Sequence, residues 1–146
     1  MQEKLVSPKG APRIWVLVLA SGENAKGAIL DFARRNDVKA AGLVALGAFQ
    51  KATLGYFDWD KKAYKPLAVN EQVEVVSLTG DIAENDKGEP DLHAHAVLGR
   101  SDGSAMGGHL LEGIVRPTLE VVVTETPAHL RRRMHKDINV ALIDVG

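Results

Sequence analysis

The chain has 146 residues, of which 45% are hydrophobic and 25% are charged, so it is long enough for one buried core and too short for two ordinary domains. Lys and Arg total 18 against 19 Asp and Glu, and the formal net charge of −1 excludes a strong overall field for a polyanion or a membrane surface. The chain has no cysteine, which excludes disulfides, thiolate metal ligands and thiol nucleophiles and fits a cytoplasmic location.

The first part of the chain predicts a lead-in, a strand and a helix. Prolines and mixed charge mark residues 1–12, which we expect to be a poorly ordered lead-in to a single domain over residues 13–146. The apolar run within residues 13–20 predicts a strand, because it is rich in Val and Leu and too short to span a membrane. Capping residues near Asn24 predict a helix to about residue 36, with one apolar face that would cover a sheet.

The rest of the chain is dominated by strand patterns, separated by glycines and polar clusters at the spacing of an antiparallel meander. Strands are expected over residues 40–49, 53–59, 64–67, 72–83, 91–98, from the turn at 100–103 to about 111, 117–125 and 139–145. A short helix is expected from Thr126 and Pro127 to Met134. The predicted fold class is α+β, a single compact domain with a mostly antiparallel sheet of seven or eight strands covered by one main helix.

Two histidines, His93 and His95, fall in the strand predicted over residues 91–98. Side chains two residues apart on a strand point to the same face and lie about 6.6 Å apart along it. These two imidazoles can therefore share one metal ion.

A third histidine, His109, joins them only if the predicted hairpin has the right register. A two-residue turn would set His109 opposite Ala96, on the other face of the sheet. A bulge at Gly107 and Gly108 could correct that register.

The turn itself offers a simpler solution. A three-residue loop of Ser101, Asp102 and Gly103, with Gly103 in the left-handed region, would set His109 opposite His95. The metal hypothesis therefore predicts a three-residue loop or a bulge in this hairpin.

Three neutral imidazoles suit Zn²⁺ best, with nickel, copper or iron as alternatives, and leave a coordination position open. Uncharged ligands leave the ion dipositive, so an anion or a hydroxide is favoured in that position. Asp91 shares the face of His93 and His95 and could accept an imidazole N–H behind the metal. Glu112 is expected on the opposite face, so no general base is assigned and an enzymatic role stays open. The histidines could also be structural residues near a subunit contact.

The stretch from Pro90 to Gly113, PDLHAHAVLGRSDGSAMGGHLLEG, resembles the signature of the plant-and-prokaryote conserved (PPC) domain. Supporting matches occur in the same order at residues 22–23, 47–49, 54–56 and 74–80, and the resemblance extends over about residues 13–145. It implies a compact α/β fold and a homotrimer. In some bacterial and archaeal members it also implies a metal held by histidines matching His93, His95 and His109.

The resemblance also implies an alternative function. Plant members join the domain to AT-hook segments that enter the DNA minor groove, and bacterial relatives are often labelled as DNA-binding by extension. This chain has no Arg-Gly-Arg-Pro hook, and its arginine tract at residues 131–133 is expected to be solvated surface. The leading hypothesis is a trimeric metal-binding protein that holds a small anionic ligand. The alternative is a DNA-binding or regulatory-complex module whose metal site is structural.

Overall fold

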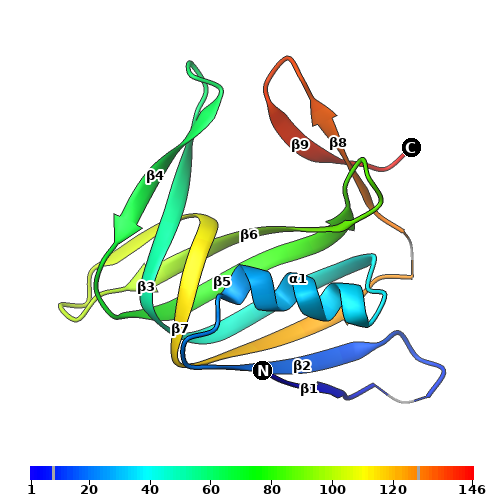
Figure 1. Cartoon of the computed structure of the whole chain (residues 1–146), viewed down its shortest axis with the longest axis horizontal. Helices are drawn as coiled ribbons and strands as arrows, with labels where there is room; N and C mark the ends of the chain where they lie inside the picture. The colour runs from blue at the N-terminus through cyan, green and yellow to red at the C-terminus, as the bar shows by residue number, and fades with distance from the viewer. Residues whose placement is uncertain (8, 128) are drawn as a thin grey trace.

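The computed structural model describes residues 1–7, 9–127 and 129–146, which form one sheet of nine strands with one helix (Figure 1). The elements are β1 (Gln2–Leu5), β2 (Ile14–Ala20), α1 (Ala25–Arg35), β3 (Ala40–Asp58), β4 (Ala63–Val69), β5 (Val73–Glu84), β6 (Pro90–Gly99), β7 (Ala105–Glu125), β8 (Arg131–His135) and β9 (Val140–Asp144). The strand pairs are antiparallel except for a parallel contact between β5 and β8, so the predicted fold class is confirmed.

Four strands form a closed ring of pairings. β3 pairs with β5, β5 with β6, β6 with β7, and β7 again with β3. Strands β2 and β1 extend this ring at one side, β4 pairs with the second half of β3, and β8 with β9 extends it from β5. The ring gives β6 a neighbouring strand on each side, with β5 paired along its whole length and β7 paired over residues 95–99.

The helix forms where its capping chemistry predicts. The Asn24 side chain accepts a hydrogen bond from the Gly27 amide at 3.1 Å, which satisfies one of the free N–H groups of the first turn. One face of α1 is buried against the sheet, through Ala25, Ile29, Phe32 and Ala33. Figure 1 shows the helix lying across the sheet below the two raised hairpins. No helix in the described ranges is long and apolar enough to cross a membrane.

Two long strands replace four shorter predicted ones. The breaks expected at residues 50–52 and 112–116 are absent, and β3 and β7 run through them with register shifts between the two strands. The bend in β3 requires Gly47, because a Cβ there would lie 2.3 Å from the Thr118 carbonyl oxygen. Bulges therefore bend these strands without ending them.

Both ends of the chain differ from expectation. Part of the predicted lead-in over residues 1–12 forms β1, which pairs with β2; residue 8 lies outside the described residues. The short helix expected over residues 126–134 is wrong in its described part, because residues 131–135 form β8 and pair with β9; residue 128 is outside the described residues. The sheet edge at β5 and the β9 ladder override the weak helix signal.

Candidate metal centre

The first two candidate ligands lie on β6, which alternates between the core and the other face of the sheet. Leu92, Ala94 and Ala96 are buried in the core, so His93 and His95 between them point away from it. The imidazole rings of this pair have centroids 5.0 Å apart. The prediction that His93 and His95 lie on the same face of this strand is confirmed.

The hairpin between β6 and β7 has the register that brings the third histidine to the same place. His95 pairs with His109 in the ladder, with no register shift along the hairpin. The Arg100 amide donates to the Ser104 carbonyl oxygen at 2.8 Å, which closes a three-residue loop, and Gly103 within it has φ +82°. The predicted three-residue loop is confirmed.

Asp102 stabilises this turn through its side chain. The Asp102 carboxylate accepts hydrogen bonds from the Ser104 amide at 2.9 Å and from the Ser104 hydroxyl at 2.6 Å. These hydrogen bonds from Ser104 lower the pKa of Asp102 below its usual value. Ser101 is an exposed turn residue beside them.

The two glycines after the turn do not form the bulge that the sequence left open. Gly107 and Gly108 pair in regular register with β6. A Cβ on Gly108 would lie 2.8 Å from the Gly55 carbonyl oxygen of β3. Gly108 therefore permits close approach of β7 to β3, and the register needs no bulge here.

The three imidazoles are close enough to share one ion. Each offers a nitrogen atom, and these three atoms all lie within 4.8 Å of one another. The Nε2 atoms of His93 and His95 are 3.3 Å apart, a separation that suits an N–H···N hydrogen bond in the metal-free chain. It also suits two ligands on one tetrahedral ion, which at bond lengths of about 2.0–2.1 Å lie about 3.3 Å apart.

Burial keeps the imidazoles of His93 and His109 in the neutral form that binds metals. Desolvation, followed by the nearby His93, lowers the pKa of His109 to about 4. Desolvation and then the positive charge of Arg132 lower the pKa of His93. Both rings are therefore neutral near pH 7, and protons compete weakly for their lone pairs.

His109 has a polar atom that the described residues leave unpaired. Its Nδ1 is buried and has no hydrogen-bond partner among them, although the ring stacks on Tyr64 at 4.5 Å between centroids. A buried unpaired nitrogen costs free energy that a bound ligand can recover. The donor set and this atom both fit a metal ion.

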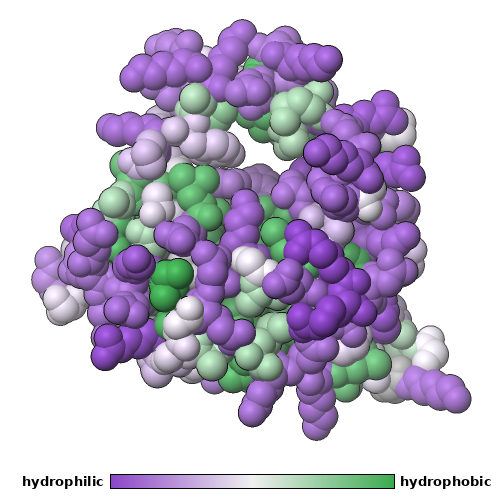
Figure 2. Space-filling model, viewed as in Figure 1, coloured by the Kyte–Doolittle hydropathy of each residue, from purple (hydrophilic) through white to green (hydrophobic). Residues whose placement is uncertain are grey.

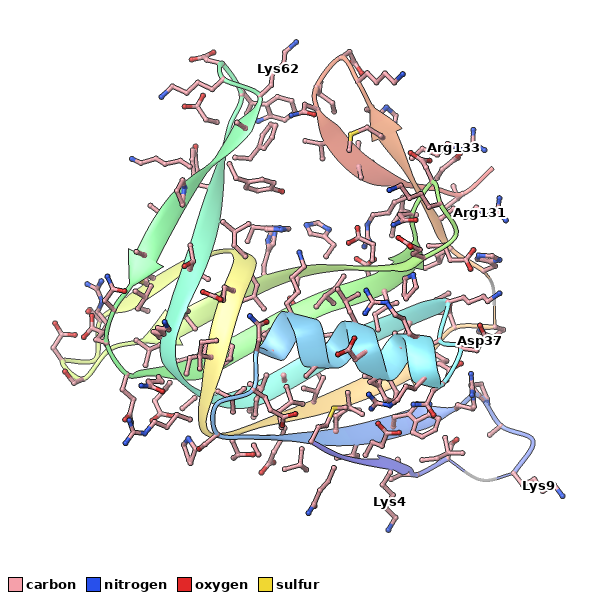
Figure 3. All side chains as sticks on the ribbon, viewed as in Figure 1. Lys4, Lys9, Asp37, Lys62, Arg131 and Arg133 are labelled. Atoms are coloured by element: carbon pink, nitrogen blue, oxygen red, sulfur yellow. The ribbon has the colours of Figure 1, made fainter. Side chains whose placement is uncertain are left out.

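One residue of the arginine tract is buried, which contradicts the expectation of solvated surface for that residue. Arg132 is 2% exposed, forms an ion pair with Asp81, and donates to the Asp91 carbonyl oxygen at 3.1 Å. Its neighbours Arg131 and Arg133 are exposed and point outward from β8 in Figure 3. Arg132 thus fastens β8 to the two strands beside the histidines.

The two carboxylates considered from the sequence have different partners. An oxygen of the Asp91 carboxylate is 3.6 Å from the Arg132 guanidinium, so an imidazole contact for Asp91 stays a prediction. β7 is bulged just before Glu112, because Leu111 is an extra residue against β3. Regular strand alternation from His109 therefore does not fix the face on which Glu112 lies. The Glu112 carboxylate accepts a hydrogen bond from the Asn24 side chain at 3.3 Å, at the start of α1.

The three histidines form part of the floor of a cavity of about 680 Å³ between two hairpins. Figure 2 shows the hollow between the hairpins, with apolar groups visible around it. The β3–β4 hairpin forms one wall, mainly with aromatic side chains, and the β8–β9 hairpin forms the other. Lys26 of α1 also lines it.

Sequence reasoning missed three parts of this cavity, namely Lys26, Arg132 and the wall formed by β8 and β9. Tyr56, Phe57 and Trp59 also line the cavity, from the β3–β4 hairpin. The sequence carries no signal for the burial of Arg132 in β8, because the whole arginine run has the composition of a solvated surface.

Comparisons with solved structures find the same fold over nearly the whole chain. A plant- and prokaryote-conserved (PPC) protein from Pyrococcus horikoshii is 30% identical, with a TM-score of 0.85 over 94% of this chain and 97% of that one. A "putative DNA-binding protein" from Ralstonia eutropha is 29% identical, with a TM-score of 0.84 over 90% of this chain and 91% of that one. A metal-containing protein from Archaeoglobus fulgidus is 29% identical, with a TM-score of 0.83 over 97% of each chain.

A curated protein sequence is also similar. It is the bifunctional protein GlmU of a Synechococcus strain, 28% identical over 122 residues. The match covers 82% of this chain but only 18% of that protein. Residues 6–127 match the Plants and Prokaryotes Conserved (PCC) domain, the domain abbreviated PPC above. Because that match takes in most of the chain and the fold agrees with its solved members, this protein belongs to the Plants and Prokaryotes Conserved domain family.

Proposed function

We propose that the chain binds one divalent transition metal, with Zn²⁺ as the first candidate, through His93, His95 and His109. The observation that carries this proposal is the convergence of three imidazole nitrogens within 4.8 Å on two paired strands. Three protein ligands leave a tetrahedral ion with one open position. Because all three are uncharged, a small anion is the ligand that this position favours.

Two further observations support the metal. The lowered pKa values of His93 and His109 keep both rings available near neutral pH. The similar protein from Archaeoglobus fulgidus is described as metal-containing. The proposal concerns metal and anion binding and assigns no reaction.

The proposal includes a homotrimer, which would cover an apolar surface that a single chain leaves exposed. On β3, Val44 and Leu46 are 54% and 63% exposed, and Val122 on β7 pairs with Val44 in the ladder. Contiguous apolar side chains of this kind are typical of subunit contacts. Sedimentation equilibrium at micromolar concentration tests it, and a monomer mass would contradict the trimer. The cytoplasmic location also stays a prediction, to be tested by cell fractionation.

Metal analysis of protein purified without an affinity tag tests the central proposal. We expect about one equivalent of transition metal per chain, and its loss in the His93→Ala, His95→Ala, His109→Ala triple variant. His135→Ala is the matched control, because His135 is exposed and does not line the cavity. Less than about a tenth of an equivalent, unchanged in the triple variant, would overturn the proposal.

DNA binding is the second candidate, and the naming of the Ralstonia eutropha relative favours it. The net charge of −1 and the burial of Arg132 leave little basic surface for phosphate contacts. Retention of a DNA duplex at near-physiological salt by the wild type, and its loss in an Arg131→Ala, Arg133→Ala variant, would support this function. Binding only at low salt would indicate non-specific charge contact.

A further inference from the structure

We propose that the cavity over the histidines binds an organic carboxylate with an aromatic or branched apolar body. The carboxylate would lie at the metal and Lys26, and the apolar body between the two hairpins. This inference rests on the proposed function for its metal end, while its apolar end rests on the cavity walls alone.

The first wall is a continuous series of aromatic rings that ends at a metal-ligand candidate. Phe57 contacts Trp59 edge to face at 5.2 Å between centroids and Tyr64 at 5.3 Å. Tyr64 in turn stacks on His109 at 4.5 Å. Rings arranged in this way favour a flat or branched apolar group lying against them.

The opposite wall is aliphatic and comes from the C-terminal hairpin. Met134, Val140 and Leu142 line the cavity from β8 and β9, and Met134 and Leu142 are 47% and 42% exposed. Apolar side chains thus face the cavity from both sides. A ligand with an apolar body would remove this surface from water, whereas a bare inorganic anion would not.

The charges at the base of the cavity favour an anionic head group. Lys26 lines the cavity together with the three histidines, and no carboxylate of the described residues forms an ion pair with it. Arg132, by contrast, is already paired with Asp81 and Asp91. Lys26 and the open metal position are therefore the two groups that would receive a carboxylate.

The tips of the two hairpins limit the size of the ligand. The Asn139 side chain in the β8–β9 turn donates a hydrogen bond to the Lys62 carbonyl oxygen in the β3–β4 turn at 3.1 Å. Figure 3 shows Lys62 at the tip facing the other hairpin. This contact bridges the top of the cavity, and a volume of about 680 Å³ is that of a small-molecule site. A compact ligand fits these limits better than a segment of a polymer.

Binding of acetate and 3-phenylpropionate to the Zn²⁺-loaded protein tests the inference by calorimetry and by tryptophan fluorescence. We expect 3-phenylpropionate to bind at least about tenfold more tightly than acetate, because only it buries apolar area against the walls. The fluorescence change should disappear in Trp59→Phe and persist in Trp15→Phe, since Trp15 packs on Phe32 at the other side of the fold. Lys26→Met should weaken both carboxylates about fivefold while zinc content stays unchanged, and exposed Lys51→Met is its charge-matched control.

The outcomes separate this inference from the metal proposal. Equal affinity for the two carboxylates, or retention of Zn²⁺ with no binding of either, would overturn the inference and leave the metal proposal standing. The second result would also arise if a neighbouring subunit filled the cavity. Failure to retain Zn²⁺ would overturn the metal proposal instead. The preference of the metal-free protein for 3-phenylpropionate over acetate would then decide whether the cavity takes an apolar body.

Discussion

The hairpin that carries the histidines in the floor of the cavity and the hairpin that forms one of its walls are held to the fold in different ways. The β6–β7 hairpin belongs to the ring of paired strands, so β6 has a hydrogen-bonded neighbour on each side. The β8–β9 hairpin meets the sheet through one parallel pair, Glu84 with Arg131. Two side-chain contacts add to that pairing, an ion pair of Arg132 with Asp81 and a hydrogen bond between the His129 ring and the Glu84 carboxylate.

This difference separates a rigid floor from a more loosely attached wall. Ladder hydrogen bonds and core packing hold the floor, whose histidines need fixed positions to share an ion. The wall depends on a few charged contacts, and regions with few buried contacts open at lower free energy than the core. The cavity can therefore admit a ligand through motion of one wall while the histidines stay in place.

Arg132→Met is expected to have the largest effect on this contrast. The substitution keeps an apolar stem but leaves Asp81 and Asp91 without their cation, and we expect a loss of about 3 kcal/mol of stability. We take the lower end of the range for breaking a buried ion pair, because both carboxylates are partly exposed. Hydrogen exchange should quicken over residues 131–144 and change little over β6.

The neighbouring Arg131 provides the control. Arg131→Met removes the same charge at an exposed position, and we expect the free energy of unfolding to change by less than about 0.5 kcal/mol. Equal loss of protection in both hairpins of the Arg132→Met protein would contradict the separation of floor and wall.

The floor should show its own pH dependence in the metal-free protein. Burial lowers the pKa of His109 from 6.5 to about 4, so between these values the unfolded chain binds more protons than the folded one. The contribution of His109 to the free energy of unfolding is therefore fully present above pH 6.5 and is lost as the pH falls toward 4. The full change in pKa corresponds to roughly 3.4 kcal/mol, but because the ring is only partly buried and solvent screens it, we expect a loss of about 2 kcal/mol across this window.

Denaturant titrations from pH 4 to pH 8 measure this effect. The difference in unfolding free energy between the wild type and His109→Phe, which keeps a ring against Tyr64, should vary below pH 6.5 and be constant above it. If the unfolding free energies of the two proteins changed with pH in parallel, the pKa of His109 would not be lowered by folding. The lowered pKa of His93 acts in the same direction.

A change in the β6–β7 turn should have a smaller effect, of about 1.5 kcal/mol. Gly103 has φ +82°, and no atom lies within 4 Å of the place that a Cβ would take, so Gly103→Val is strained only by its backbone conformation. Gly103→Asn should cost less, since Asn tolerates the left-handed region. Thermal unfolding measures both, and equal melting temperatures for the two variants would contradict the role of φ.

The sequence predicted the histidine cluster because its determinants are local. Strand alternation places His93 with His95, and a loop of three residues sets His109 opposite His95, all within one hairpin. The main helix was predicted for the same reason, from a cap and an apolar face that lie within a few residues of each other.

The cavity wall was not predictable in this way. Arg132 is buried by a partner 51 residues away, Asp81, and nothing within the arginine run distinguishes it from its exposed neighbours. The expected break in β3 failed for a similar reason, since its bend depends on the approach of Thr118 to Gly47. Long-range pairing decided both features.

The smallest expected effect is at the contact between the hairpin tips. Asn139→Gly removes the donor to the Lys62 carbonyl oxygen but keeps the left-handed backbone that Asn139 adopts at φ 56°. Because this hydrogen bond is exposed, stability should fall by about 0.5 kcal/mol or less. Backbone relaxation should nevertheless show faster motion at both tips, and 3-phenylpropionate should dissociate faster. Asn139→Asp, which also lacks the donor, should behave alike, and unchanged tip motion in both variants would mean that the tips are held by other contacts.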